Sequence, residues 1–181
     1  MYLETERVKL REFCQADESN LYDLDSDPEV MRYLTNGVPS SREWVKGALE
    51  RIISLTRAHG GQFGFWAAIE KESNAFMGWF HFRPGKNDPD NLKRIELGYR
   101  LRRVFWGKGY ATEVSRALIA KGFDEFAVEE VFALTMKANL ASQRVMKKSG
   151  LSFVREFFND EFPGIGEMVV EFSISKQVTA K

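Results

Sequence analysis

The sequence predicts an α/β fold in which strands and helices alternate within a single domain covering residues 1–181. Three observations support this prediction. Segments of strand length, rich in aromatic and branched residues, recur along the chain, and segments with helical spacing lie between them. No repeat, low-complexity run or linker interrupts their order. With 44% hydrophobic and 29% charged residues, the chain is suited to bury one core.

The first third of the chain predicts one strand followed by helices. Residues 6–13 alternate in polarity, as a half-buried strand does. Two short helices follow, because the Asp27-Pro28 pair interrupts the helical spacing between them. Ser40 and Glu43 have the spacing of a capping box, so we expect a longer helix to begin at Ser40.

The rest of the chain predicts an antiparallel meander and then mixed elements. Residues 63–69, 76–82 and 95–101 are expected to form three successive strands. The later elements are a helix from Tyr110 to Phe123, a strand at 131–136, a helix at 139–148 that ends before Gly150, and closing strands at 153–158 and 168–174. Helices therefore interleave with strands in one layered structure.

Charge and cysteine content exclude several classes of protein. Lys plus Arg and Asp plus Glu both number 26, so no net field attracts nucleic acid or an anionic membrane. Cys14 is the single cysteine, so no internal disulfide forms, and the first residues lack a signal-peptide profile. No run of about 18 apolar residues is present. We expect a cytoplasmic protein.

A glycine turn between a predicted strand and helix is the main functional signal. Gly107 and Gly109 allow a tight turn whose N–H groups can surround an anion at the start of the helix. Arg102, Arg103 and Lys108 add positive charge beside it. The turn predicts a pyrophosphate site, and the alternative is a tight connection without a ligand.

Other known motifs match this sequence less well. Thr112 stands where a dinucleotide-binding motif needs its third glycine, and Gly109 follows Lys108 where a nucleoside-triphosphate loop needs Ser or Thr. No Gly-x-Ser-x-Gly elbow is present, and His59, His81 and Cys14 lack the spacing of metal ligands. We therefore expect neither a hydrolase triad nor a metal.

Several linked segments resemble the GNAT superfamily of acetyl-CoA-dependent N-acetyltransferases, especially the branch that acetylates N-terminal Ala or Ser of ribosomal proteins. They are Ile95-Glu96-Leu97-Gly98-Tyr99, Trp106-Gly107-Lys108-Gly109-Tyr110-Ala111-Thr112-Glu113, Asn139-Leu140-Ala141-Ser142-Gln143-Arg144-Val145-Met146, Ser149-Gly150-Leu151 and the opening Thr5-Glu6-Arg7-Val8-Lys9-Leu10-Arg11. The resemblance covers nearly the whole chain. One departure is Val104, where the family often has Gln or Arg.

The resemblance implies a fold and an acetyl-CoA site. The fold is a mixed, mostly antiparallel, strongly twisted sheet of about six to seven strands, with helices on both faces and a splayed central strand pair. The backbone of Leu97, Gly98 and Tyr99 would pair with the pantetheine arm. The pyrophosphate would lie against Val104, Gly107, Lys108, Gly109, Tyr110, Ala111 and Thr112. Asn139 and Ser142 would lie beside the thioester.

Transfer to an amine needs a group that removes a proton from nitrogen and one that gives a proton to sulfur. Glu96 is the predicted base, since partial burial raises the pKa of a carboxyl, and its alternative role is an ion pair with Arg94 or Arg100. Ser142 is the predicted acid, with Tyr99 or Tyr110 as alternatives. Cys14 has no nearby base and is expected to be inert, so transfer is direct.

The acceptor is the least determined part. We expect Tyr33, Trp44, His81 and Phe158 to shape an amine pocket, with Asn159, Asp160 and Glu161 attracting a cation. The resemblance favours a peptide or ribosomal-protein α-amine. A polyamine, an amino acid or an antibiotic amine remain alternatives, as do a non-catalytic acyl-CoA sensor and a protein-interaction module. No nucleic-acid or membrane partner is expected, and the protein is a monomer or a homodimer.

Overall fold

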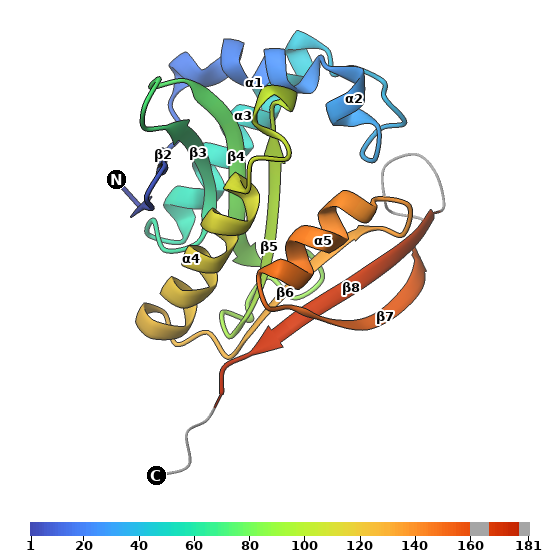
Figure 1. Ribbon diagram of the computed structural model, residues 1–181. Helices are drawn as coiled ribbons and strands as arrows, with labels where there is room; N and C mark the ends of the chain where they lie inside the picture. Colours follow the sequence, from blue (N-terminus) through green and yellow to red (C-terminus); the bar gives the residue numbers. More distant parts are fainter. Residues whose placement is uncertain (160–166, 178–181) are drawn as a thin grey trace.

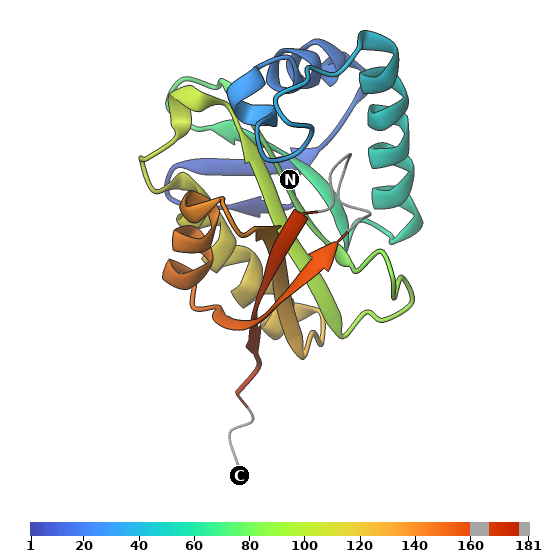
Figure 2. The same ribbon diagram turned by 90° about the vertical axis from the view of Figure 1, so that its right-hand side faces the viewer.

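The computed structural model describes residues 1–159 and 167–177, which form one mixed sheet with helices on both faces (Figures 1 and 2). Its eight strands are ordered β1-β2-β3-β4-β5-β6-β8-β7. In chain order they are β1 (Leu3–Glu4), β2 (Val8–Glu12), β3 (Gly64–Glu70), β4 (Phe76–Pro84), β5 (Arg94–Leu101), β6 (Glu130–Met136), β7 (Ser152–Asn159) and β8 (Glu167–Ser175). The mixed α/β fold is confirmed, and the strand that sequence missed is the short β1.

The helices lie between these strands in the predicted order. They are α1 (Glu18–Asp25), α2 (Pro28–Met31), α3 (Arg42–Ala58), α4 (Tyr110–Glu125) and α5 (Leu140–Lys148), with short 3₁₀ helices η1 (Gln15–Asp17) and η2 (Arg103–Phe105). Figure 1 shows α4 and α5 on one side of the sheet, whereas Figure 2 shows α3 on the other.

The predicted start of the long α3 helix was wrong by one residue. The N–H of Trp44 donates to Ser41 Oγ at 3.2 Å, so Ser41 is the N-cap. Ser40 instead donates its backbone N–H to the carbonyl of Asp25 at 3.0 Å, which ties it to the end of α1. The capping-box spacing at Ser40 therefore predicted the helix correctly but placed its N-cap one residue too early.

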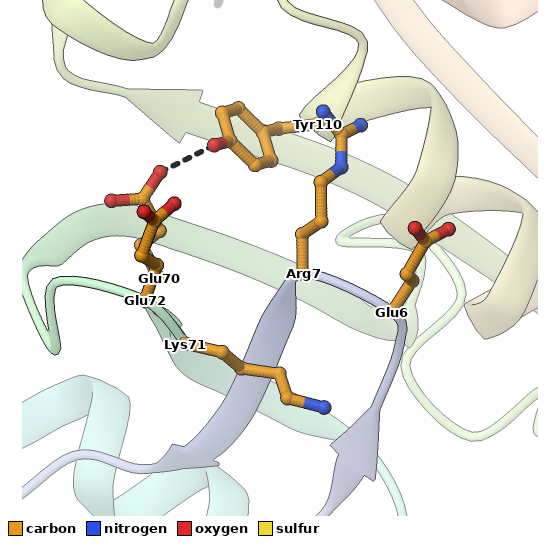
Figure 3. Close-up of a pocket in the computed structure, with 6 residues that line it drawn as sticks. All are labelled: Glu6, Arg7, Glu70, Lys71, Glu72 and Tyr110. Carbon is orange, nitrogen blue, oxygen red and sulfur yellow. Dashed lines mark hydrogen bonds between the residues drawn. The ribbon is translucent and has the colours of Figure 1, made fainter.

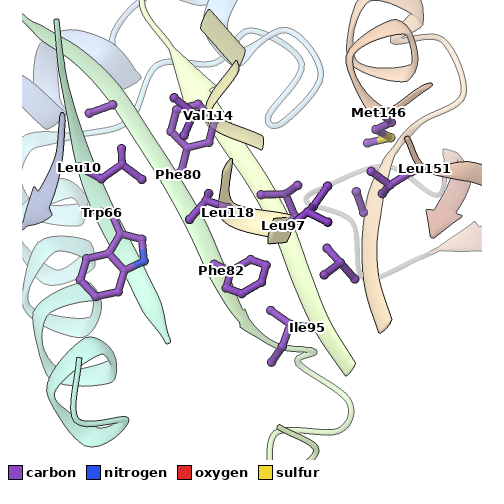
Figure 4. Packing of buried hydrophobic residues seen from close by; sticks show 14 of the residues in the cluster. Leu10, Trp66, Phe80, Phe82, Ile95, Leu97, Val114, Leu118, Met146 and Leu151 are labelled. Atoms are coloured by element: carbon purple, nitrogen blue, oxygen red, sulfur yellow. The ribbon is translucent and has the colours of Figure 1, made fainter. Parts of the chain in front are cut away.

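The core follows the two-residue period of the strands. On β5, Ile95, Leu97 and Leu101 are buried among residues of α4 and neighbouring strands. Figure 4 shows part of this cluster, including Leu10, Trp66, Phe80, Phe82, Val114, Leu118, Met146 and Leu151. A second cluster packs α1 and α3 against the opposite face through Leu21, Leu24, Val45 and Leu49. Burying each such leucine is worth about 2 kcal/mol.

The sheet opens at its centre, where β5 and β6 run parallel. Their pairing ends at Glu96 opposite Phe132. Beyond that point β5 continues to Leu101 against β4, and β6 continues to Met136 against β8. The edge of β5 that faces β6 is therefore free of strand pairing from Leu97 to Leu101, within the part of the chain that the structure describes. This is the splayed strand pair that the resemblance implied.

Candidate functional site

A cavity of about 630 Å³ occupies the region where β5 and β6 separate. Side chains from both faces of the sheet line it, because β5 contributes Glu96 and Arg100 from one face and Leu97 and Leu101 from the other. The glycine turn and the start of α5 also line it. One cavity thus joins the two faces of the sheet and reaches most of the predicted site.

The glycine turn has the conformation that an anion cradle needs. Gly107 has φ 73° and Gly109 has φ 85°, a left-handed region that residues with a side chain rarely adopt. Gly109 is the N-cap of α4, a helix of 16 residues whose first N–H groups lack helical partners. This geometry fits a pyrophosphate bound by backbone donors and by the partial positive charge of the helix.

Arg7 holds this turn in place, and local sequence gave no signal for its role. Its Nη1 donates to the carbonyl of Lys108 at 3.0 Å, and its Nη2 lies 2.7 Å from Glu113. The guanidinium also lies over the ring of Tyr110 at 4.3 Å. On the other side of the turn, Trp106 Nε1 donates to the carbonyl of Leu101 at 2.7 Å. The contact of Arg7 with Lys108 thus spans 101 residues of sequence, whereas that of Trp106 with Leu101 spans five.

The predicted cofactor residues separate into two groups. Leu97, Gly98, Tyr99, Gly107, Gly109, Tyr110, Ala111, Thr112, Asn139 and Ser142 all line the cavity. Val104, in η2, has 66% of its surface exposed, and Val104 and Lys108 are outside the lining that the described residues form. A cradle of backbone N–H groups uses neither side chain, so the departure at Val104 is compatible with the turn.

Ser142 lies beside the hydroxyl of a tyrosine. Asn139 caps α5, its Oδ1 accepting the N–H of Ser142 at 3.1 Å, which places Ser142 in the first turn of the helix. Tyr99 Oη lies 3.5 Å from Ser142 Oγ, at the upper limit of a hydrogen bond. Burial raises the pKa of Tyr99, which keeps its hydroxyl protonated and able to donate.

The other predicted tyrosine points elsewhere. The hydroxyl of Tyr110 donates to Glu70 in a separate hollow of about 290 Å³, which Figure 3 shows together with Arg7 and Lys71. Tyr110 also lines the main cavity. Of the hydroxyls proposed as proton donors, only Tyr99 and Ser142 therefore lie together among the described residues.

Glu96 lies on the opposite face of β5 from these hydroxyls. Its Oε2 is 2.8 Å from Arg83 Nη2 on β4, whereas the expected partners Arg94 and Arg100 pair elsewhere, with Glu130 and with Asp25. Glu96 therefore forms an ion pair, which was its alternative role, but the partner is Arg83 and not Arg94 or Arg100. Burial raises the pKa of Glu96, and the positive charges of Arg83, Lys86 and Arg94 oppose that rise.

The predicted acceptor residues are only partly brought together. Tyr33 and His81 line the cavity, beside Trp79 and Arg100. Trp44 is 52% exposed on α3 and Phe158 is 64% exposed on β7, and neither is among the described lining residues. Asn159 ends β7, while Asp160 and Glu161 lie outside the described residues. Arg100 was not expected to line the acceptor region, but it does, and its charge is paired with Asp25 of α1.

The described residues form neither a metal-binding group nor a membrane-spanning helix. Within residues 1–159 and 167–177, no group of three or more His, Cys, Asp or Glu side chains has the geometry of a metal site. None of the helices described there combines the length and the hydropathy needed to cross a bilayer.

Comparison with known proteins extends the resemblance. The family model described as an acetyltransferase (GNAT) domain matches residues 7–152. The chain is 32% identical to the FsC-acetyl coenzyme A-N(2)-transacetylase of Aspergillus fumigatus, over 97% of this chain and 76% of that protein.

Solved structures share the fold at lower identity. A GNAT acetyltransferase from Bacillus anthracis has a TM-score of 0.82 at 23% identity, covering 97% of this chain and 98% of that one. RimL, a ribosomal L7/L12 α-N-protein acetyltransferase solved with coenzyme A, has a TM-score of 0.79 at 16% identity, covering 96% and 97%. A Vibrio cholerae spermidine N-acetyltransferase solved with coenzyme A and spermine has a TM-score of 0.72 at 12% identity, covering 93% and 95%.

The family match spans most of the chain and falls on the same turn, splayed strands and capped helix that line the cavity. This chain therefore belongs to the GNAT family and is an acetyl-CoA-dependent N-acetyltransferase.

Proposed function

We propose that the protein transfers the acetyl group directly to a primary α-amine that enters from the face of β5 bearing Glu96. One observation carries the proposal: a single cavity connects Glu96 on one face of the sheet with Ser142 and Tyr99 on the other, through the gap between β5 and β6. A proton acceptor and a proton donor thus lie on opposite sides of the place where the thioester would be held.

Acetyl-CoA would be bound by the elements already described. The N–H groups after Gly107 and Gly109 would hold its pyrophosphate, and the unpaired edge of β5 would bond its pantetheine arm. The bound cofactor supplies an activated acetyl group. The N–H groups of Leu97 or Tyr99 are our candidates for stabilising the thioester oxygen.

The charges of the cavity favour an acceptor with one amine over a polyamine. Both carboxylates of the described lining already face arginines: Glu96 is 2.8 Å from Arg83, and Glu29 is 4.0 Å from Arg32. The same lining therefore offers no buried carboxylate free of an arginine for the second ammonium group of a polyamine, since Glu29 is an exposed side chain.

An α-amine is also a better nucleophile than the ε-amine of lysine at neutral pH. Its pKa is about 8, compared with about 10.4 for a lysine ε-amine, so far more of it is neutral and nucleophilic at pH 7. Two similar proteins point the same way, since one name specifies an N(2) nitrogen and the other an α-N-protein acceptor. We propose peptides or protein N-termini that begin with Ser or Ala as the first substrates to examine, in the cytoplasm.

The roles of the side chains follow from their positions. The nitrogen–carbon bond forms as the carbon–sulfur bond breaks, one amine proton passes to Glu96, and the hydroxyl of Ser142 or Tyr99 protonates the departing sulfur. Cys14 is exposed at the start of η1 and takes no part.

The proposal is tested by offering the purified protein acetyl-CoA with a panel of amines. The panel contains Ser- and Ala-initiated peptides, the same peptides with a blocked α-amine and one lysine, spermidine and an aminoglycoside. Mass spectrometry should find acetylated products chiefly from the free α-amines. Acetylation confined to lysine, spermidine or the aminoglycoside would contradict the α-amine acceptor.

A further inference from the structure

His81 is a fixed, buried imidazole with one unused nitrogen in the wall of the cavity. The residue is 9% exposed, and its Nε2 has no hydrogen-bond partner in the described part of the chain. Its ring stacks on Trp79 at 5.8 Å and meets the edge of Phe65 at 5.2 Å. Packing therefore fixes the ring, and its buried Nε2 lacks the hydrogen-bond partner that buried polar atoms normally have.

Gly98 makes room for this ring. The two residues are directly opposite each other on β4 and β5, and a Cβ at Gly98 would lie 2.5 Å from His81 Nε2. Any larger residue at 98 would displace the imidazole or the strand. The absence of a side chain at Gly98 thus places Nε2 next to the gap between β5 and β6.

Glu96 presents a second acceptor beside the first. Its Oε1 lies 3.7 Å from His81 Nε2, which is too far for a hydrogen bond between them. Both atoms are within reach of a single nitrogen about 2.9 Å from each. A ligand nitrogen with two N–H groups would satisfy both acceptors at once.

We propose that His81 Nε2 and Glu96 Oε1 each accept one N–H of a neutral primary amine, which directs the lone pair of the amine toward the thioester. The inference rests on the proposed function and names the amine class: primary and neutral when bound. His81 is then a positioning and specificity residue. When the new nitrogen–carbon bond forms, Glu96 takes the proton that it faces, and the other N–H remains on the amide product, bonded to His81.

The charges around His81 are consistent with this role. Burial lowers the pKa of His81 well below its usual value, and Arg83 on β4 and Arg100 on β5 lower it further. Glu96 of β5 is paired with Arg83, and Asp25 of α1 is paired with Arg100. The imidazole therefore stays neutral, with a lone pair to offer, and the same two arginines disfavour an ammonium ion at this position.

The test compares a peptide that has a primary α-amine with its N-methyl counterpart, which has a single N–H when neutral. We expect the wild type to prefer the primary amine by about tenfold in kcat/KM, the order of one lost hydrogen bond. His81→Phe keeps an aromatic ring and should lose most of that preference, with an unchanged KM for acetyl-CoA. His81→Gln, whose amide oxygen can replace Nε2, should retain it.

A second test uses the wild-type protein, so it does not depend on whether the His81 variants fold. The chain has two histidines, so ¹⁵N labelling gives His81 and His59 as separate signals, with His59 as the internal reference. An unprotonated Nε2 at His81 that shifts when the peptide and coenzyme A bind is the expected result. A protonated Nε2, or a His81→Phe variant that slows both amines equally, would overturn the inference. Absence of turnover with any α-amine in the wild type would instead contradict the proposed function.

Discussion

Replacing Arg83 with Met tests how the protein sets the basicity of Glu96. Arg83 Nη2 lies 2.8 Å from Glu96 Oε2, and the two side chains are only 13% and 15% exposed. A nearby cation at such a distance lowers the pKa of a carboxyl by about 1 to 3 units. Lys86 and Arg94 remain in the variant, so we expect the pKa of Glu96 to rise further above its usual value, by less than if all three cations were lost.

The direction of the change in activity follows from the role of Glu96. A base works only when ionised, so kcat at saturating peptide, into which the ionisation of the free amine does not enter, falls as the pH drops through the pKa of Glu96, which burial raises in the folded protein. Without Arg83 that fall should begin at a higher pH. Arg83→Lys keeps a cation and should move the acid limb little, whereas Glu96→Gln should remove the limb and slow turnover about a hundredfold.

The assay measures release of the coenzyme A thiol with a chromogenic reagent from about pH 5 to about pH 9. Cys14 is an exposed thiol and would react too, so each variant carries Cys14→Ser and is compared with Cys14→Ser alone. Coenzyme A affinity, measured by calorimetry, should be unchanged. An acid limb in Arg83→Met that coincides with that of the parent would refute the electrostatic reasoning, and a limb that survives Glu96→Gln would refute the assignment of the base.

Further changes test the rest of the site. Gly109→Pro should abolish coenzyme A binding by calorimetry, because proline cannot adopt the φ of 85°; unchanged affinity in a folded variant would contradict the cradle. Ser142→Ala combined with Tyr99→Phe should lower kcat by about a hundredfold or more with little change in coenzyme A affinity, whereas a wild-type rate would remove both hydroxyls from the mechanism. Asp25→Asn should reduce the free energy of unfolding by about 3 to 5 kcal/mol in denaturant titration, because Arg100 stays buried without its partner; an effect below about 1 kcal/mol would show that the pair is dispensable.

Local chemistry made much of the fold predictable. The two-residue period of β5 separates Ile95 and Leu97 from Glu96, and the same period was visible in the sequence. The turn at Gly107 and Gly109 and the cap at Asn139 were likewise readable, because each depends on residues a few positions apart. The strand β1 has only two residues, too short for a periodic signal.

The site was less predictable, because its contacts join distant segments. Arg83 and Glu96 meet because β4 and β5 pair in a register that no local pattern encodes, and sequence neighbours Arg94 and Arg100 were the wrong partners. Arg7 likewise bonds to Lys108, a residue 101 positions away in the sequence. Trp44 was expected in the acceptor pocket on residue type alone, and the orientation of α3 exposes it instead. The sequence does not show whether an aromatic side chain near a binding region points into the site or toward solvent.

The proposed acceptor and base are tested together with one peptide that carries both a free α-amine on an N-terminal Ser and a lysine. The peptide is incubated with acetyl-CoA and either the wild type or Glu96→Gln, and tandem mass spectrometry locates the acetyl group. We expect the wild type to acetylate the α-nitrogen and Glu96→Gln to do so about a hundredfold more slowly at the same position. Acetylation of the lysine alone, or an equal rate in Glu96→Gln, would contradict this expectation.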